Sequence, residues 1–396
     1  MDRKTFYRER RRKARIKIVY ICSIIVFLFS MILFFQTTSF NAQKILYKHG
    51  HKHIIASVKP NNIELEKVEE EPDIVEESEP EINIIFAGDT MFDWGLRPIL
   101  DKHGYDYPFT HVKKKVQAAD YAFINAETVF TKRAEKDPNQ LFWIKSEVQG
   151  LDALKNAGFD MLNIGNNHTL DYLRPGLLDT LQHVESYDFD YIGAGRNAKD
   201  AYAAKEVIIK GKKFKFFSFI RFIPSTDWLA VEGKSGVPNG YDLPLVKKTI
   251  QEQQGDADYT IVYFHWGVEK QNKPVDYQRQ YAQELQQIGV DLIVGSHPHW
   301  LQGFEIFDGM PVAYSLGNFL FPPYVKDETA QTGLLTAKFH GNNITLSFDP
   351  HIIDNGKIKP LSEKAYNNML MYLESISFNI RITETGEIHP KQSNSH

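Results

Sequence analysis

The sequence predicts an α/β protein in which a layered β-sheet core is flanked by helices. Strand-like apolar runs alternate with stretches of helical pattern, which is typical of βαβ units and a mostly parallel sheet. Short polar motifs follow most of the apolar runs, and open α/β folds form their sites at the carboxyl ends of strands. The 396 residues, 42% of them hydrophobic, suffice for one large core or two smaller ones.

The folded part is expected to begin near Ile82, where an acidic stretch gives way to apolar residues. Strands are expected at Ile82–Phe86, Tyr121–Ile124, Met161–Ile164, Thr260–Phe264, Leu292–Val294 and Val312–Tyr314. Helices are expected at Val112–Ala119, Glu147–Ala157, Pro175–Ser186, Leu245–Gln254 and Tyr277–Ile288.

Two hairpins and an antiparallel tail are also predicted. Val207–Ile209 and Phe214–Ile220 form an inserted hairpin around Gly211-Lys212, and Asp308-Gly309 turns a second one. From Gly333 onward the pattern is antiparallel. Residues 82–330 are therefore expected to form the main domain. Residues 331–396 are expected to be a β-rich extension of the same domain that completes a second sheet.

The amino-terminal segment has the pattern of a membrane anchor. Residues 1–15 are strongly basic, and Ile16–Phe35 contains one charged residue, Lys17. Twenty residues at about 1.5 Å each span a hydrocarbon core of about 30 Å, and the basic flank favours a cytoplasmic amino terminus. We expect a cytoplasmic tail at 1–15, a single-pass transmembrane signal-anchor at 16–37, and an extracellular remainder.

Two alternatives exist for this segment. A cleaved signal peptide is disfavoured because the apolar run is long and its best cleavage site, Thr37-Thr38-Ser39, is weak. A buried core helix is disfavoured because core helices are rarely this apolar on every side and flanked by basic residues.

The composition of the chain excludes some classes of partner and of metal site. Residues 38–81 are rich in acidic residues and predict a disordered stalk, because like charges repel and little apolar surface is available to bury. The net charge of −4 gives no basic footprint, so nucleic acid is not expected as a partner. The single cysteine, Cys22, lies in the predicted anchor, which excludes disulfides and cysteine-ligated zinc from the exported part.

Seven polar motifs carry the candidate chemistry. They are Gly88-Asp89, Asn125-Ala126-Glu127, Gly165-Asn166-Asn167-His168, Asp171, His265-Trp266-Gly267, His297-Pro298-His299 and Ser315-Leu316-Gly317-Asn318. Carboxylates, amides and histidines gathered at one sheet edge suit two divalent ions bridged by a carboxylate, or one ion with open positions. Manganese, zinc or iron fits this donor set.

Individual motifs allow more ordinary interpretations. A glycine before Asp89 favours a sharp turn, but Gly-Asp is also common in plain turns. Asp171 is close enough in sequence to orient His168 by a hydrogen bond, and Glu269 is similarly placed for His265. A lone histidine after a strand is more often structural than a ligand. His297 and His299 are expected to point to one side of an extended segment.

The ordered set of motifs resembles the CapA/PgsA family of poly-γ-glutamate capsule synthesis proteins. The matching motifs are Gly88–Met91, Asn125–Glu127, Asn166–Asp171, His265–Glu269, His297–His299 and Ser315–Phe319, and the resemblance runs from about Ile82 to Phe321. That family is in turn similar to the calcineurin-like metallophosphatases, which implies a metallophosphatase-like domain.

The resemblance implies a role for each motif residue. The implied metal ligands are Asp89, Glu127 as the bridging carboxylate, Asn167, His265, His297 and His299. His168 and Asp171 would be catalytic, and Asn125, Asn166, Glu269 and Asn318 would bind substrate. One departure is visible: Asp89-Thr90-Met91 has methionine where the phosphatases have a second histidine ligand. This departure weakens the case for phosphatase activity more than the case for metal binding.

The implied function is assistance in the assembly or export of poly-γ-glutamate outside the cell, together with membrane ligase and export subunits. The cations near the motif loops are candidate contacts for the polymer: Lys132, Arg133, Lys136, Arg174, Arg196 and Arg221. Two alternatives remain open at this point. One is a metal-dependent hydrolase acting on an amide or a phosphoester, and the other is a scaffold without catalytic activity.

Overall fold

The computed structural model describes residues 79–391. The predicted basic tail, the anchor and nearly all of the stalk lie outside these residues. Within the described part, no helix combines the length and apolar character that a membrane crossing requires.

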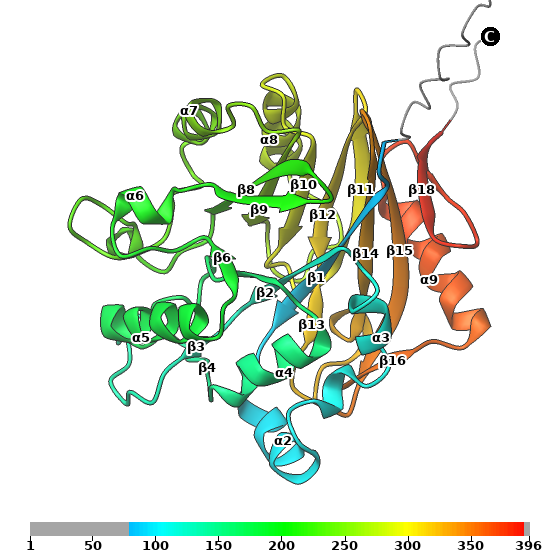
Figure 1. The fold of residues 1–396 in the computed structure, drawn as a ribbon. Coiled ribbons are helices and arrows are strands. Elements are labelled where there is room, and N and C mark those ends of the chain that lie inside the picture. Colours follow the sequence, from blue (N-terminus) through cyan, green and yellow to red (C-terminus); the bar gives the residue numbers. More distant parts are fainter. Residues whose placement is uncertain (1–78, 392–396) are drawn as a thin grey trace, which may run out of the picture. The chain divides into compact units, whose positions relative to one another are not determined.

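The described residues form four layers, with two stacked β-sheets between two sets of helices (Figure 1). The first sheet has the spatial order β17-β18-β15-β14-β1-β2-β5-β6, with β13 also paired to β1 and β16 to β15. Its strands are β1 (Ile82–Thr90), β2 (Tyr121–Ala126), β5 (Met161–Asn163), β6 (Asp190–Ile192), β13 (Asn318–Leu320), β14 (Gln331–His340), β15 (Asn343–Asp354), β16 (Lys357–Pro360), β17 (Ile380–Ile382) and β18 (Glu387–Pro390).

The second sheet has the order β11-β12-β10-β9-β8-β7. Its strands are β7 (Lys205–Ile209), β8 (Lys212–Ile220), β9 (Tyr259–His265), β10 (Leu292–Ser296), β11 (Leu301–Phe307) and β12 (Met310–Leu316), and β3 (Val129–Phe130) pairs with β4 (Lys145–Ser146) apart from both sheets.

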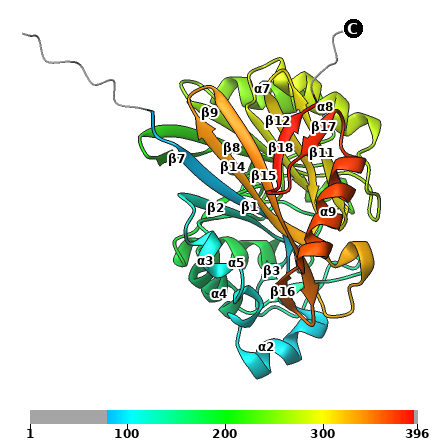
Figure 2. The same ribbon diagram turned by 90° about the vertical axis from the view of Figure 1, so that its right-hand side faces the viewer.

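The described residues contain eight α-helices, most of which cover the two outer faces of the sheets. They are α2 (Arg97–His103), α3 (Lys113–Val116), α4 (Gln149–Ala157), α5 (Leu173–Ser186), α6 (Ala198–Ala201), α7 (Leu243–Gln253), α8 (Asp276–Gln286) and α9 (Glu363–Ile376), with short 3-10 helices at Trp94–Leu96, Tyr107–Phe109, Thr226–Trp228 and Asp327–Thr329. Helices α2 to α5 lie on the first sheet, whereas α7 and α8 lie on the second (Figures 1 and 2).

Strand β1 illustrates how the sequence produces these layers. Successive side chains of a strand point to opposite faces of its sheet. Ile84 and Phe86 therefore enter the core between the two sheets, whereas Ile85 and Ala87 enter the core under α4 and α5. A strand buried on both faces has to be apolar throughout, which explains its continuous hydrophobic run.

The expected helices and strands are found, with shifted ends, but three features of the predicted arrangement are wrong. The tail does not complete a second sheet, because β14 pairs antiparallel with β1 in the centre of the first sheet. That sheet is consequently mixed rather than mostly parallel. The hairpin of β7 and β8 is present, but it is not an insertion, because residues 214–220 of β8 pair in parallel with β9.

The β-rich description of residues 331–396 is also incomplete. Helix α9 lies in this segment, and its residues Leu370, Leu373 and Ile376 are buried. Leu373 and Ile376 pack into the core between the sheets. The side chain of Ser362 accepts a hydrogen bond from the backbone of Ala365, which is the usual start signal of a helix.

Candidate metal centre

The carboxyl ends of strands from both sheets meet and bring the polar motifs together. In the first sheet, Asp89 is in register with Asn125, and Asn125 with Asn163. In the second sheet, Ser296 is in register with His265. Because the sheets stack face to face, these two rows of side chains converge at one end of the core.

Gly88 permits the close approach on which this convergence depends. A Cβ at this position would lie 2.1 Å from the backbone oxygen of Gly317, so no larger residue fits. The glycine is therefore required by contact with a neighbouring segment and not by a turn, since β1 continues to Thr90. The amide of Asp89 donates to that same oxygen of Gly317 at 2.9 Å.

Asp89, Glu127 and His299 form the centre of the site. One ligand atom from each of these side chains lies within 4.8 Å of the others. Glu127 Oε1 is 3.8 Å from His265 Nε2 and 3.9 Å from His168 Nε2, whereas Oε2 is 3.9 Å from His299 Nδ1. Glu127 thus lies between three imidazoles, where one carboxylate can serve two ions or one.

Unpartnered polar atoms indicate that a cation belongs here. Glu127 and His297 are fully buried, yet neither Oε of Glu127 nor either ring nitrogen of His297 has a hydrogen-bond partner in residues 79–391. Burial of an unpaired carboxylate costs several kcal/mol, roughly, unless an opposite charge compensates it. The donor set of carboxylates and imidazoles fits a divalent metal ion.

Amide side chains hold the carboxylate of Asp89 in place. Asn125 Nδ2 donates to Asp89 Oδ1 at 2.6 Å, and Asn163 Nδ2 donates to Asn125 Oδ1 at 2.7 Å. Across the two sheets, the backbone amide of His297 donates to Asp89 Oδ2 at 3.2 Å. These bonds fix the aspartate before any ion arrives, which reduces the cost of ordering it on binding.

The loop after β5 supplies the second group of site residues. His265 Nε2 is 2.6 Å from Asn167 Oδ1, which brings an amide oxygen and an imidazole together beside Glu127. The side chain of Asn166 donates to the backbone oxygen of Ala126 at 2.9 Å and accepts from the amide of His168 at 3.1 Å, so it shapes the loop. Its Nδ2 also lies 3.4 Å from Asn125 Oδ1.

His168 and Asp171 form the predicted pair. His168 Nδ1 lies 2.7 Å from Asp171 Oδ2. Asp171 is itself held by the amide of Ile144 at 2.7 Å and by Gln140 Nε2 at 2.8 Å. This arrangement leaves His168 Nε2 directed toward Glu127, as a group that exchanges a proton at the metal centre requires.

Burial and neighbouring charges perturb the pKa values of these groups. Burial, followed by the charge of Asp89, raises the pKa of Glu127 to about 8. Burial also lowers the pKa of His265 and of His297 well below 6.5, so both imidazoles are neutral and able to ligate. For His168, burial lowers the pKa but the Asp171 carboxylate outweighs it, and the net shift is upward.

Two expected placements are wrong. Glu269 is exposed and forms no hydrogen bond with His265, whose Nδ1 contacts Ser296 Oγ at 3.1 Å instead. His297 and His299 do not lie on an extended segment, because their φ angles are 101° and 57°. The chain turns through left-handed conformations here, and their ring centroids are 6.2 Å apart. Such strain in non-glycine residues is concentrated at functional sites.

Asn318 was expected to bind substrate. Its Oδ1 lies 2.9 Å from His299 Nδ1, so the side chain orients that ring.

Three other residues of the site were not expected from the sequence, namely Asn163, Ser296 and Gln140. The signal for Asn163 and Ser296 was a polar residue inside an otherwise apolar strand, whereas Gln140 comes from a loop without any pattern.

Comparison with known proteins assigns the family. Residues 83–323 match the family described as "Bacterial capsule synthesis protein PGA_cap", which is more than half of the chain. The chain belongs to this family. The predicted resemblance to CapA/PgsA proteins is thereby confirmed, and the matched span contains every residue of the candidate metal centre.

Named relatives of the family are similar over part of their length. The chain is 31% identical to "Capsule biosynthesis protein CapA" of Bacillus anthracis over 245 residues, 61% of this chain and 60% of that protein. It is 31% identical to "PGA biosynthesis protein CapA" of Bacillus subtilis over 255 residues, 64% of this chain and 66% of that protein. The chain thus spans slightly less than two thirds of these relatives.

Solved structures show weaker likeness. The NAD nucleotidase of Haemophilus influenzae matches with a TM-score of 0.40 and 14% identity, over 76% of this chain and 64% of that one. The 5′-nucleotidase of Candida albicans matches with a TM-score of 0.37 and 16% identity, over 64% and 46%. Neither likeness is close enough to carry over an activity.

Proposed function

We propose that this protein is a membrane-anchored, extracytoplasmic component of poly-γ-glutamate capsule synthesis. In this role it assists polymer assembly or export together with a membrane ligase complex. The observation that carries the proposal is the family match over residues 83–323, which includes the whole strand-end cluster. The basic, then apolar, amino-terminal sequence supports the anchored topology.

The metal centre gives this role a physical basis. Asp89, Glu127 and His299, with His265, His297 and Asn167 beside them, would hold one or two divalent ions, of which manganese, zinc and iron fit the donors. A bound ion supplies positive charge that attracts the carboxylates of an acidic polymer. The protein's own part is to keep Asp89 fixed through Asn125 and to keep water-accessible surface small around Glu127.

A second candidate is metal-dependent hydrolysis of an amide bond of the polymer or of a phosphoester. The observation that favours it is the buried His168–Asp171 pair beside Glu127. Asp171 raises the pKa of His168 against the effect of burial, which favours the protonated imidazole. Such a group can donate a proton to a leaving atom at its Nε2.

Deletion of the gene in its own host tests the first proposal. Surface-bound and released poly-γ-glutamate would be measured as glutamate after acid hydrolysis, in the deletion strain and after return of wild-type or Glu127→Gln genes. We expect loss of the polymer, restoration by the wild type and no restoration by the variant. Unchanged polymer in the deletion strain would refute the role in capsule synthesis.

The purified full-length protein separates the two candidates. After loading with Mn²⁺ or Zn²⁺, it would be tested for cleavage of poly-γ-glutamate and of a phosphoester, with His168→Ala as the matched variant. Turnover that His168→Ala abolishes would establish the hydrolase. Bound metal without turnover would leave the assembly role, because that role requires binding alone.

A further inference from the structure

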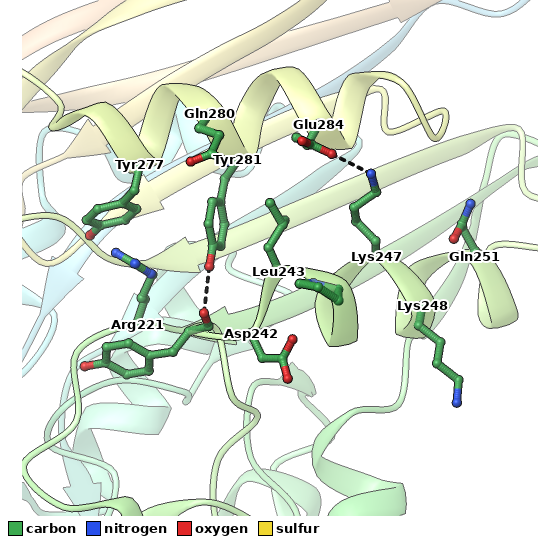
Figure 3. A pocket seen from close by; sticks show the side chains of 12 residues that line it. Arg221, Asp242, Leu243, Lys247, Lys248, Gln251, Tyr277, Gln280, Tyr281 and Glu284 are labelled. Carbon is green, nitrogen blue, oxygen red and sulfur yellow. Dashed lines mark hydrogen bonds and ion pairs between the residues drawn. The ribbon is translucent and has the colours of Figure 1, made fainter. Parts of the chain in front are cut away.

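A pocket lies beside the metal centre, between α7, α8 and the segment that follows β8 (Figure 3). Its volume is about 920 Å³. Tyr277 and Tyr281 extend into it from α8, and Lys247 and Lys248 border it on α7. It thus combines aromatic rings with basic side chains at the end of the sheet where the site residues gather.

Arg221 is the central cation of this pocket. Its guanidinium carbon lies 3.3 Å from the centroid of the Tyr277 ring, and 5.2 Å and 5.5 Å from those of Tyr281 and Tyr241. A guanidinium stacked on an aromatic face is held rigidly and keeps its edge free for a planar anion. Three rings therefore position Arg221, and none of them supplies an anion to its hydrogen-bond donors.

Those donors have no anionic partner in the described part of the chain. The Nε of Arg221 is buried without a hydrogen-bond acceptor in residues 79–391. The other arginines near the motif loops differ, because Arg133 pairs with Asp179, Arg174 with Asp227 and Arg196 with Glu185. These three are explained as surface ion pairs. Arg221 is left as the arginine with an unmet requirement for an anion.

The acidic residues of the pocket do not meet that requirement. Glu284 is paired with Lys247 at 2.6 Å, and Asp242 accepts from the amide of Leu245 at 3.1 Å as the cap of α7. Lys248 lies 3.8 Å from Glu252, and both side chains are exposed. The residues that line the pocket include three cations and two carboxylates, so the lining carries a small net positive charge.

The segments that line the pocket also contact residues of the metal centre. The backbone amide of Arg221 donates to the backbone oxygen of His265 at 2.8 Å. The next residue, Phe222, stacks on the ring of His297 with 4.2 Å between centroids. On the α8 side, the hydroxyl of Tyr277 accepts from the amide of Gly267 at 2.7 Å. Both walls of the pocket are thus one or two residues from a candidate metal ligand.

We propose that Arg221, framed by Tyr277, Tyr281 and Tyr241, is a carboxylate-binding subsite for an acidic polymer that passes the metal centre. This inference rests on the proposed function and extends it, because it assigns the recognition of the polymer to residues outside the metal ligands. A γ-linked glutamate unit uses its side-chain carboxyl in the backbone and keeps its α-carboxylate free. Each unit therefore offers one planar anion, which a guanidinium edge can bind through two hydrogen bonds.

Binding measurements on the metal-loaded full-length chain in a neutral detergent test the subsite. Poly-γ-glutamate, free glutamate and polyphosphate would be titrated against wild type, Arg221→Gln and Arg221→Lys. Arg196→Gln is the matched control, since it removes the same charge from another pocket. We expect Arg221→Gln to weaken polymer binding about tenfold or more, as loss of a charged hydrogen bond does. Arg221→Lys should restore part of it and Arg196→Gln should stay within about twofold of wild type.

The possible results distinguish failure of the proposed subsite from failure of the proposed function. Equal binding by wild type and Arg221→Gln, or an equal loss in Arg196→Gln, would overturn the subsite while leaving the proposed function in place. No binding of poly-γ-glutamate by the wild type would overturn both. Free glutamate that binds as tightly as the polymer would identify the amino acid as the source of the carboxylate, and polyphosphate that binds more tightly would overturn the carboxylate assignment. Unchanged metal content in Arg221→Gln shows that the metal centre is intact.

Discussion

Replacing Glu127 by glutamine should make the metal-free protein more stable and abolish its response to metal. The side chain is fully buried and neither oxygen has a hydrogen-bond partner in the described residues. Glutamine has nearly the same shape and cannot ionise, so the substitution opens no cavity and removes a group whose ionisation favours the unfolded state. A residue retained at a cost to stability is expected where function requires it.

The size of the effect follows from the pKa of Glu127. Burial, followed by the charge of Asp89, raises this pKa from 4.5 to about 8. The folded state then holds its proton more tightly than the unfolded state, so the free energy of unfolding falls as pH rises from 4.5 toward 8. About two and a half pH units of this window lie below pH 7, and each unit lowers the free energy of unfolding by about 1.4 kcal/mol. At pH 7 the raised pKa therefore costs roughly 3 kcal/mol of stability. The buried amide of glutamine offsets part of this, so we expect a net gain of about 1–3 kcal/mol.

Urea denaturation of the full-length protein with a chelator, at pH 5 and pH 7, measures this gain. The gain should be present at pH 7 and nearly absent at pH 5, and added Mn²⁺ or Zn²⁺ should raise the melting temperature of the wild type but not of Glu127→Gln. Glu269→Gln, the same change at an exposed residue, should alter stability by less than about 0.5 kcal/mol. A Glu127→Gln variant that is less stable than the wild type at pH 7 would show that burial of Glu127 does not cost stability. A variant whose melting temperature rises with metal as much as that of the wild type would show that Glu127 is not a ligand.

Three further predictions come from the geometry and one from the sequence. His297→Ala, like the equivalent change at the other imidazole ligands, should at least halve the metal content measured by elemental analysis, while the circular dichroism spectrum stays unchanged. Loss of the folded spectrum would instead indicate a structural role. Asp171→Asn should lower the pKa of His168, because burial then acts without the neighbouring carboxylate. NMR titration of the metal-free protein measures this pKa, and an unchanged value would contradict the pairing of the two side chains. Gly88→Ala should lower the free energy of unfolding by roughly 3 kcal/mol or more, since the added Cβ would lie 2.1 Å from a backbone oxygen. Denaturant unfolding measures this change, and a variant as stable as the wild type would contradict the contact. Deletion of residues 60–80 should leave the melting temperature unchanged, whereas a fall would show that the predicted stalk contributes to the fold.

The sequence was sufficient to predict most of the residues that gather at the site. Apolar runs that end in Asp89, Asn125 or His265 can be recognised locally, because a polar side chain at the end of a buried strand has no packing role. The pairing of His168 with Asp171 could also be predicted, since Asp171 is only three positions after His168. The short range of these signals explains why they were reliable.

Long-range arrangement could not be predicted in this way. Nothing local in β14 indicates that it pairs with β1, because strand order depends on contacts between segments about 250 residues apart. The same limit applies to Arg221, which was one of six candidate cations in the sequence. Among the four arginines of that set, only the structure distinguishes it, by giving the other three carboxylate partners and Arg221 none in the described residues.

Asp89, Glu127 and His299 are expected to hold a divalent cation. Crystals of the metal-loaded protein, with diffraction recorded on both sides of the absorption edge of the loaded metal, test this binding site. We expect an anomalous peak within about 2.0–2.3 Å of oxygen or nitrogen atoms of these three side chains. Loaded crystals without a peak there, or with their only peak on surface residues, would contradict it.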